Sequence, residues 1–146
     1  SIDISNAGFY SNQLEDFTSR WQQAIAAWEK EASSLKGAPV VVHHKAFSYM
    51  LDWLELRQVA SLELKPGIPP TTSHLESLLQ QLKVKPAVVI IRTPYEPDDA
   101  SEWLSEKTGT PALVLPYTIG GDAESNDLFA LFDRSINLLK GALDDQ

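Results

Sequence analysis

The chain has 146 residues, 43% hydrophobic and 22% charged, which suits one compact domain with a single core. Twelve Lys and Arg against 20 Asp and Glu give a net charge of −8, so the chain lacks the basic face that a nucleic-acid partner requires and favours cations instead. It has no cysteine, which excludes disulfides, thiol chemistry and Cys-ligated zinc. No apolar run approaches the roughly 20 residues that a membrane span needs, so we expect a soluble protein.

The first segment predicts one long amphipathic helix. Apolar residues recur at steps of three and four from Leu14 to Leu35, and they include Trp21 and Trp28, which we expect in the core or at a contact with another lobe. Gly37 and the proline two residues later form a helix stop. Such a helix spans roughly 40 Å, more than a small domain needs. We therefore expect it to extend beyond its own core and to brace another part of the protein.

After Pro39 the pattern alternates short apolar runs with helical stretches. Runs that are apolar on both faces, such as Ala87–Ile91, are typical of a parallel sheet covered by helices on each side. Ser73 followed by Glu76 indicates a capping box. We therefore expect an α/β fold, with a four-stranded, mostly parallel sheet flanked by helices and preceded by the long helix. The expected strands are 40–43, 59–64, 87–91 and 112–115, and the expected helices are 45–56, 73–83, 98–107 and 127–143.

Side chains able to bind a ligand follow every predicted strand. The carboxyl ends of parallel strands share one edge of a sheet, and ligands bind at that edge in open α/β folds. The residues placed there are His43, His44, Glu63, Arg92, Thr93, Tyr95 and Tyr117. Adjacent strand residues point to opposite faces, so we expect the turn into the helix to free His44 to face the crevice.

The histidine pair has two interpretations, a metal site or a structural, helix-capping role. Neutral imidazole is the commonest metal ligand in proteins, and without thiols zinc or manganese would depend on His and carboxylate donors.

The other sequence motifs give weaker indications of function. The "TIGG" stretch lacks the spacing of a phosphate loop, and no nucleophile-elbow sequence surrounds a serine. No motif in the sequence indicates an enzyme.

Five segments stand in an informative order, namely "DISNAGFYSNQLEDF", "VVVHHKAFSYMLDWLEL", "LKPGIPPTTSHLESLLQQLK", "VVIIRTPYEP" and "VLPYTIGG". Together they resemble the C-terminal half of the solute-binding proteins of zinc and manganese ABC transporters, from about Ile4 to Leu143. The resemblance implies two α/β lobes joined by one rigid helix, with a metal between them and about two ligands from each lobe. Residues 1–37 would be the connecting helix and 38–146 the C-terminal metal-binding lobe of a longer protein.

The resemblance also implies a function. The chain would be part of a non-enzymatic receptor that captures a divalent cation, Zn²⁺ or Mn²⁺, as cargo and uses no organic cofactor. Its partners would be an ABC permease in the inner membrane and the missing N-terminal lobe, and no nucleic acid. The location would be the periplasm, or the extracellular face if the protein is anchored to the membrane.

The implied ligands match the family only in part. His44, followed by "KAFSYM", stands where the family has its C-lobe histidine. Tyr117 stands where the family has an Asp or Glu ligand, and a neutral phenol is a poor substitute for a carboxylate. Arg92 occupies a position that is often acidic in the family. The metal-ligand candidates are therefore His44, His43, Glu63 and Tyr117, with Arg92 and Tyr95 lining the same crevice.

Three explanations for the departure at Tyr117 stay open. Either His43 or Glu63 supplies the missing ligand, or the N-terminal lobe compensates, or the cargo is a metal complex or no metal at all. The last case leads to an alternative function, a lobe that holds a small anionic or chelated ligand with Arg92, Tyr95 and Tyr117 while the histidines are structural. A flavodoxin-like or regulatory domain is a third possibility, weakened because no acidic cluster follows the first strand.

Overall fold

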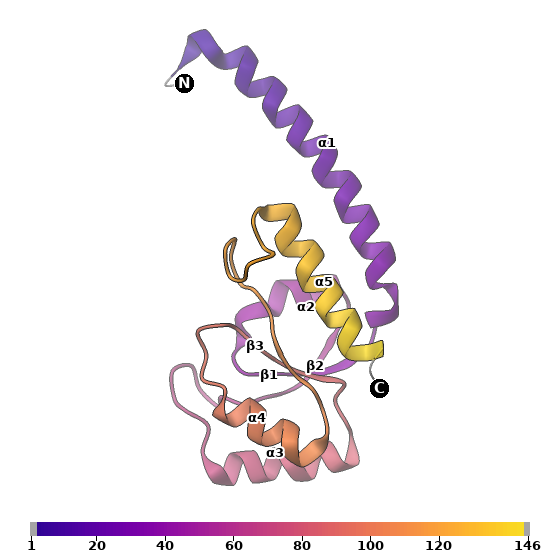
Figure 1. Ribbon diagram of the computed structural model, residues 1–146, viewed down its shortest axis with the longest axis vertical. Helices are drawn as coiled ribbons and strands as arrows, with labels where there is room; N and C mark the ends of the chain where they lie inside the picture. The colour runs from indigo at the N-terminus through magenta and orange to yellow at the C-terminus, as the bar shows by residue number, and fades with distance from the viewer. Residues whose placement is uncertain (1–2, 145–146) are drawn as a thin grey trace.

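The computed structural model describes residues 3–144, and Figure 1 shows an α/β lobe from which one long helix, α1, projects. Helix α1 spans Ala7–Glu31, and 3-10 helices at Ile4–Asn6 and Ala32–Leu35 extend it at both ends. The chain then turns at Gly37, whose φ of 75° lies in the left-handed region that glycine tolerates best. The predicted long helix and its stop are therefore confirmed.

The sheet has four strands, β1 (Pro39–Val42), β2 (Arg57–Ser61), β3 (Val89–Arg92) and β4 (Ala112–Val114). Their order across the sheet is β2-β1-β3-β4, and every neighbouring pair is parallel. The expected α/β fold is confirmed, and the sheet is parallel throughout. Because all strands run the same way, their carboxyl ends share one edge.

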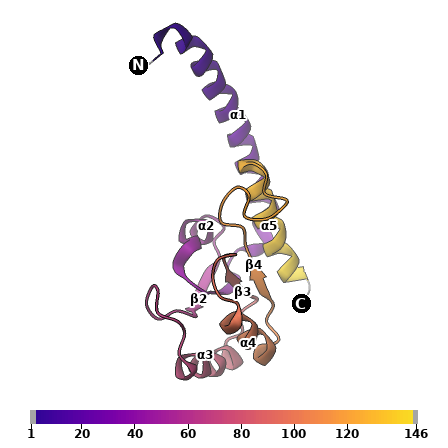
Figure 2. The ribbon, with the colours of Figure 1, turned by 60° about the vertical axis from the view of Figure 1, so that its left-hand side comes forward.

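Helices cover both faces of this sheet. They are α2 (Ser48–Trp53), α3 (Thr72–Val84), α4 (Asp99–Thr108) and α5 (Leu128–Asp144). Figures 1 and 2 show α3 and α4 on one side of the strands, and α2, α5 and the lower part of α1 on the other. Within residues 3–144 no helix combines the length and the apolar character of a membrane span.

The apolar strand residues divide between two cores. On the side of α1, α2 and α5, Val40, Val42 and Ile91 pack in one cluster with Trp28 and Ile136. On the other side, Val41 and Ile90 pack in a second cluster with residues of α3 and α4, namely Leu78, Leu82 and Leu104. Alternate residues of one strand thus enter opposite cores, which is why the strand sequences are apolar without interruption.

The base of α1 is fixed to the lobe by aromatic side chains. Trp28 is 2% exposed, and its Nε1 donates to Oδ1 of Asp133 in α5 at 2.5 Å. The ring of Trp21 meets those of Trp28, Phe129 and Phe132 edge to face at 5.1–5.3 Å between centroids. The tryptophan stripe is therefore a core contact. The earlier apolar residues of this segment are exposed, namely Ile4, Phe9, Tyr10 and Leu14.

Two local predictions differ from the structure. The expected helix 45–56 is present as a 3-10 helix at Lys45–Phe47 and the α-helix α2, but it ends at Trp53 because Glu55 adopts a left-handed φ of 55° and turns the chain into β2. The capping box of Ser73 and Glu76 does not form. Helix α3 starts one residue earlier, and the side chain of Thr71 caps it by accepting from the backbone N–H of His74.

Candidate functional site

The two adjacent histidines lie on opposite faces of the sheet. The backbone of His43 continues the ladder beyond β1, since its N–H donates to Ile91 and its carbonyl accepts from the N–H of Glu63. This pairing preserves the strand alternation, so His43 shares the side of Val41, where α3 and α4 pack, and His44 takes the side of Val42. The pair therefore does not converge on one point.

His44 is paired with the carboxylate that follows the neighbouring strand. Its Nδ1 lies 2.8 Å from Oε2 of Glu63, and the two side chains are 37% and 15% exposed. A carboxylate accepts hydrogen bonds, so in the neutral imidazole Nδ1 carries the proton and Nε2 keeps its lone pair. The backbone at His44 is extended, with φ −128° and ψ 163°, and the 3-10 helix begins at the next residue. As predicted, the side chain stands where a strand gives way to a helix.

Tyr117 follows β4 and belongs to an aromatic group. Its ring meets Phe47 at 5.6 Å and Tyr95 at 6.0 Å between centroids, both edge to face. It also lines an apolar groove between α2 and α5, and it is 46% exposed. The structure thus brings the two predicted tyrosines together at the carboxyl edge of the sheet.

Arg92 is turned toward the loop between β3 and α4. Its Nη1 donates to the carbonyls of Thr93 and Glu96 at 3.5 and 3.4 Å, and Nη2 lies 4.0 Å from Oδ2 of Asp98. Arg92 ends β3 on the same face as Ile90, whereas Phe47, the partner of Tyr117, packs in the opposite core. The guanidinium is thus bonded within its own loop, on the face of the sheet opposite to Phe47.

The donor set within this chain is small. Among residues 3–144, no three or more His, Asp and Glu side chains lie close enough together to hold a metal ion. What the edge does offer is one half-exposed imidazole, oriented by a carboxylate, beside an aromatic surface. Such an arrangement can donate one nitrogen to a metal whose other ligands come from elsewhere.

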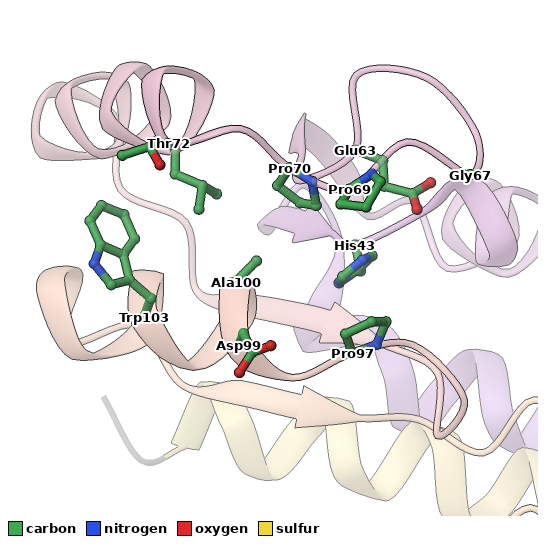
Figure 3. Close-up of a pocket in the computed structure, with 11 residues that line it drawn as sticks. His43, Glu63, Gly67, Pro69, Pro70, Thr72, Pro97, Asp99, Ala100 and Trp103 are labelled. Carbon is green, nitrogen blue, oxygen red and sulfur yellow. The ribbon is translucent and has the colours of Figure 1, made fainter.

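The sequence pattern did not reveal that His43 faces a cavity on the α3–α4 side. Figure 3 shows its ring opposite Pro69 and Pro70 of the β2–α3 loop and Ala100 of α4. The cluster of prolines between residues 66 and 70 was the available signal, because a stiff loop can hold such a space open. His74, the third histidine, bonds through Nε2 to the carbonyl of Ser61.

The sequence matches one protein family. The family model described as ZnuA, zinc-uptake complex component A, periplasmic, matches residues 1–142. None of the proteins of curated function matches the chain significantly.

Solved structures share the fold. A crystal structure of ZnuA is 19% identical with a TM-score of 0.75, and the match covers 94% of this chain and 50% of that one. The laminin-binding adhesin Lmb of Streptococcus agalactiae is 17% identical (TM-score 0.74, 97% and 53% covered). The protein FpvC of Pseudomonas aeruginosa, in complex with Ni²⁺, is 21% identical (TM-score 0.73, 99% and 54% covered). This chain therefore spans about half the length of the structures that it matches.

Proposed function

The chain belongs to the ZnuA family of periplasmic zinc-uptake components, and from that premise we propose that it is the C-terminal half of a metal-binding receptor for an ABC transporter. Its cargo would be Zn²⁺ or a similar divalent ion. FpvC structures contain Ni²⁺ or Mn²⁺, which supports a metal cargo without identifying it. The site would work by capture and release, and its location would be the periplasm or the outer surface of the cell.

The observation that carries this proposal is the hydrogen bond between His44 and Glu63. Metal-binding histidines commonly donate the second ring N–H to a carboxylate, which fixes the tautomer and raises the basicity of the ligating nitrogen. We assign Nε2 of His44 as the metal ligand and Glu63 as the group that orients it. Because His43 lies on the other face, we assign it no place in the coordination shell.

The remaining ligands would come from the other half of the protein. One imidazole does not make a metal site, and Tyr117 offers a neutral oxygen at best. The matched structures are about twice as long as this chain, which leaves room for a second lobe. The exposed apolar residues near the start of α1, Ile4, Phe9, Tyr10 and Leu14, are the surface that we expect this lobe to cover. The permease would then receive the metal from the assembled protein.

The test follows imidazole nitrogens by ¹⁵N NMR during a titration of this chain with ZnCl₂. With only three histidines, the spectrum can be assigned by single substitutions. Before zinc, we expect His44 as the Nδ1–H tautomer. Zinc should then shift Nε2 of His44 at concentrations that leave the resonances of His43 unchanged.

His44→Gln should abolish the heat of zinc binding in calorimetry with ZnCl₂, whereas His74→Gln should preserve it, because His74 bonds to a backbone carbonyl and has no carboxylate partner. An Nε2–H tautomer at His44, or equal zinc shifts at His44 and His74, would contradict the assignment.

A further inference from the structure

A cavity of about 680 Å³ lies between the β2–α3 loop and the first turns of α3 and α4 (Figure 3). The residues around it include Pro69 and Pro70 from the loop, Leu75 from α3, and Ala100 and Trp103 from α4. All these elements lie across the sheet from α1, α2 and α5. The volume falls within the roughly 300–1,000 Å³ that is usual for small-molecule pockets. The cavity is thus large enough for an organic molecule, and His44 is not among the residues that line it.

One buried imidazole, that of His43, lines this cavity. His43 is 2% exposed, and within residues 3–144 its Nδ1 has no hydrogen-bond partner. Its backbone is held on both sides by the sheet. Buried polar side-chain atoms are nearly always paired in folded proteins. The imidazole that lines the cavity therefore has hydrogen-bonding capacity that the described residues do not use, and a ligand group can use it.

The charges around the cavity select the kind of ligand. No Lys or Arg lines it, and its two charged residues, Glu63 and Asp99, are both acidic. An anionic ligand would meet these carboxylates without a compensating cation. The remaining walls are mostly apolar, and Trp103 offers an aromatic face.

We propose that this cavity binds a small, non-anionic organic molecule with an aromatic or alicyclic body. Its one polar group, a hydroxyl or an amine, donates a hydrogen bond to the imidazole of His43, and its ring lies against Trp103 and the prolines. The proposal uses neither His44 nor a metal, so it stands apart from the proposed transport function. Glu63 touches both places, since it lines the cavity and bonds to His44, and ligand binding should therefore perturb the Nδ1 resonance of His44 as well.

Three fluorinated probes of similar shape test the proposal by ¹⁹F NMR titration of this chain. They are 4-fluorophenethyl alcohol, 4-fluorophenethylamine and 4-fluorophenylacetate, which are neutral, cationic and anionic at pH 7. We expect saturable binding of the alcohol and the amine with a Kd at or below about 1 mM, and binding of the acetate at least about tenfold weaker. The proposal is overturned if neither the alcohol nor the amine saturates, or if the acetate binds as well as they do.

Substitutions then locate the bound probe. Ala100→Leu at the wall and Thr72→Tyr at the exposed rim should each raise the Kd of the alcohol at least about fivefold. His43→Phe keeps a ring but removes the acceptor, and it should weaken the alcohol similarly. Ala27→Leu, an equivalent enlargement on the exposed side of α1, should leave binding unchanged. Circular dichroism and thermal melting identify the variants that fold.

Thr72→Tyr is solvent-exposed and keeps the test decisive even if Ala100→Leu or His43→Phe unfolds. An unchanged Kd in every folded cavity variant would place the probe elsewhere and overturn the assignment.

Discussion

His44 and Glu63 are joined by a 2.8 Å hydrogen bond that connects the end of β1 to the segment following β2. These strands are neighbours in the sheet, so the position of the imidazole is set by two strands rather than by one loop. Ligands that are held in this way bind metals with less loss of side-chain freedom. The pair is therefore the part of the edge that we expect to respond most sharply to substitution.

Glu63→Gln should weaken the zinc response at His44 by about tenfold or more. The amide can still accept from Nδ1, but it no longer supplies the negative charge that makes Nε2 a better donor, and loss of such partners usually costs 10–100-fold in affinity. The measurement is the zinc concentration at half-shift of the Nε2 resonance. Glu76→Gln, an exposed acid on α3, controls for the change in net charge. An equal weakening of the zinc response in Glu63→Gln and Glu76→Gln would show that the net charge of the chain, and not the hydrogen bond to His44, causes the effect.

Tyr117→Asp should strengthen zinc binding by at least about tenfold. The family resemblance places an acidic ligand at this position, and a carboxylate is a far better zinc donor than a neutral phenol. Tyr49→Asp is the matched control, because Tyr49 is 93% exposed on α2 and its loss should add the same charge without adding a ligand. Calorimetry with ZnCl₂ compares the two. A gain shared by both variants would argue against a role for position 117.

Two glycines predict stability changes of opposite sign. Gly109 ends α4 with φ 74°, and Gly109→Ala should lower the free energy of unfolding by about 1 kcal/mol, because a side chain disfavours that backbone conformation. Gly141 lies inside α5, and Gly141→Ala should raise the free energy of unfolding by up to about 1 kcal/mol. An added Cβ meets no neighbour within 4 Å at either position, so backbone preference decides both outcomes. Urea unfolding measures them.

Asp122 predicts a loss of stability in acid. Hydrogen bonds from Ser125 and from the guanidinium of Arg134 lower the pKa of this carboxyl below its ordinary value of 3.8. A lowered pKa means that the stabilisation is present above about pH 4 and is lost as the pH falls through the folded-state value. Asp122→Asn should therefore be less stable than the parent chain at pH 7 and should approach it near pH 2. Urea unfolding at both pH values measures the difference in the free energy of unfolding between the parent chain and Asp122→Asn. A difference that is larger at pH 2 than at pH 7 would contradict the prediction.

Much of the fold follows from local sequence. Val40, Val41 and Val42 can be fully buried only between two helical layers, and that requirement predicts the parallel sheet. The end of α4 at Gly109 was predictable for the same kind of reason, since glycine suits the left-handed position after a helix. The cap of α3 was not, because Thr71 and Ser73 are both good caps and only the path of the proline loop selects Thr71.

The candidate site was predictable in position but not in detail. The sequence predicted that His44 and Glu63 lie at one edge of the sheet, whereas their hydrogen bond depends on the register of β1 against β2. The separation of His43 from His44 depends on how far the strand ladder continues past Val42. The cavity depends on how α3 and α4 pack beside the loop, which no local pattern encodes. The assignments of metal ligands stay predictions.

A small tilt at the base of the long helix α1 produces a large displacement at its far end. Its 25 residues correspond to about 37 Å, and its fully buried residue, Trp28, lies near the end that joins the lobe. A tilt of about 5° at that aromatic pivot would displace the opposite end by about 3 Å, more than a metal–ligand bond length. The packing of Trp21 and Trp28 against Phe129 and Phe132 therefore sets how accurately anything carried by the far end is aligned with His44.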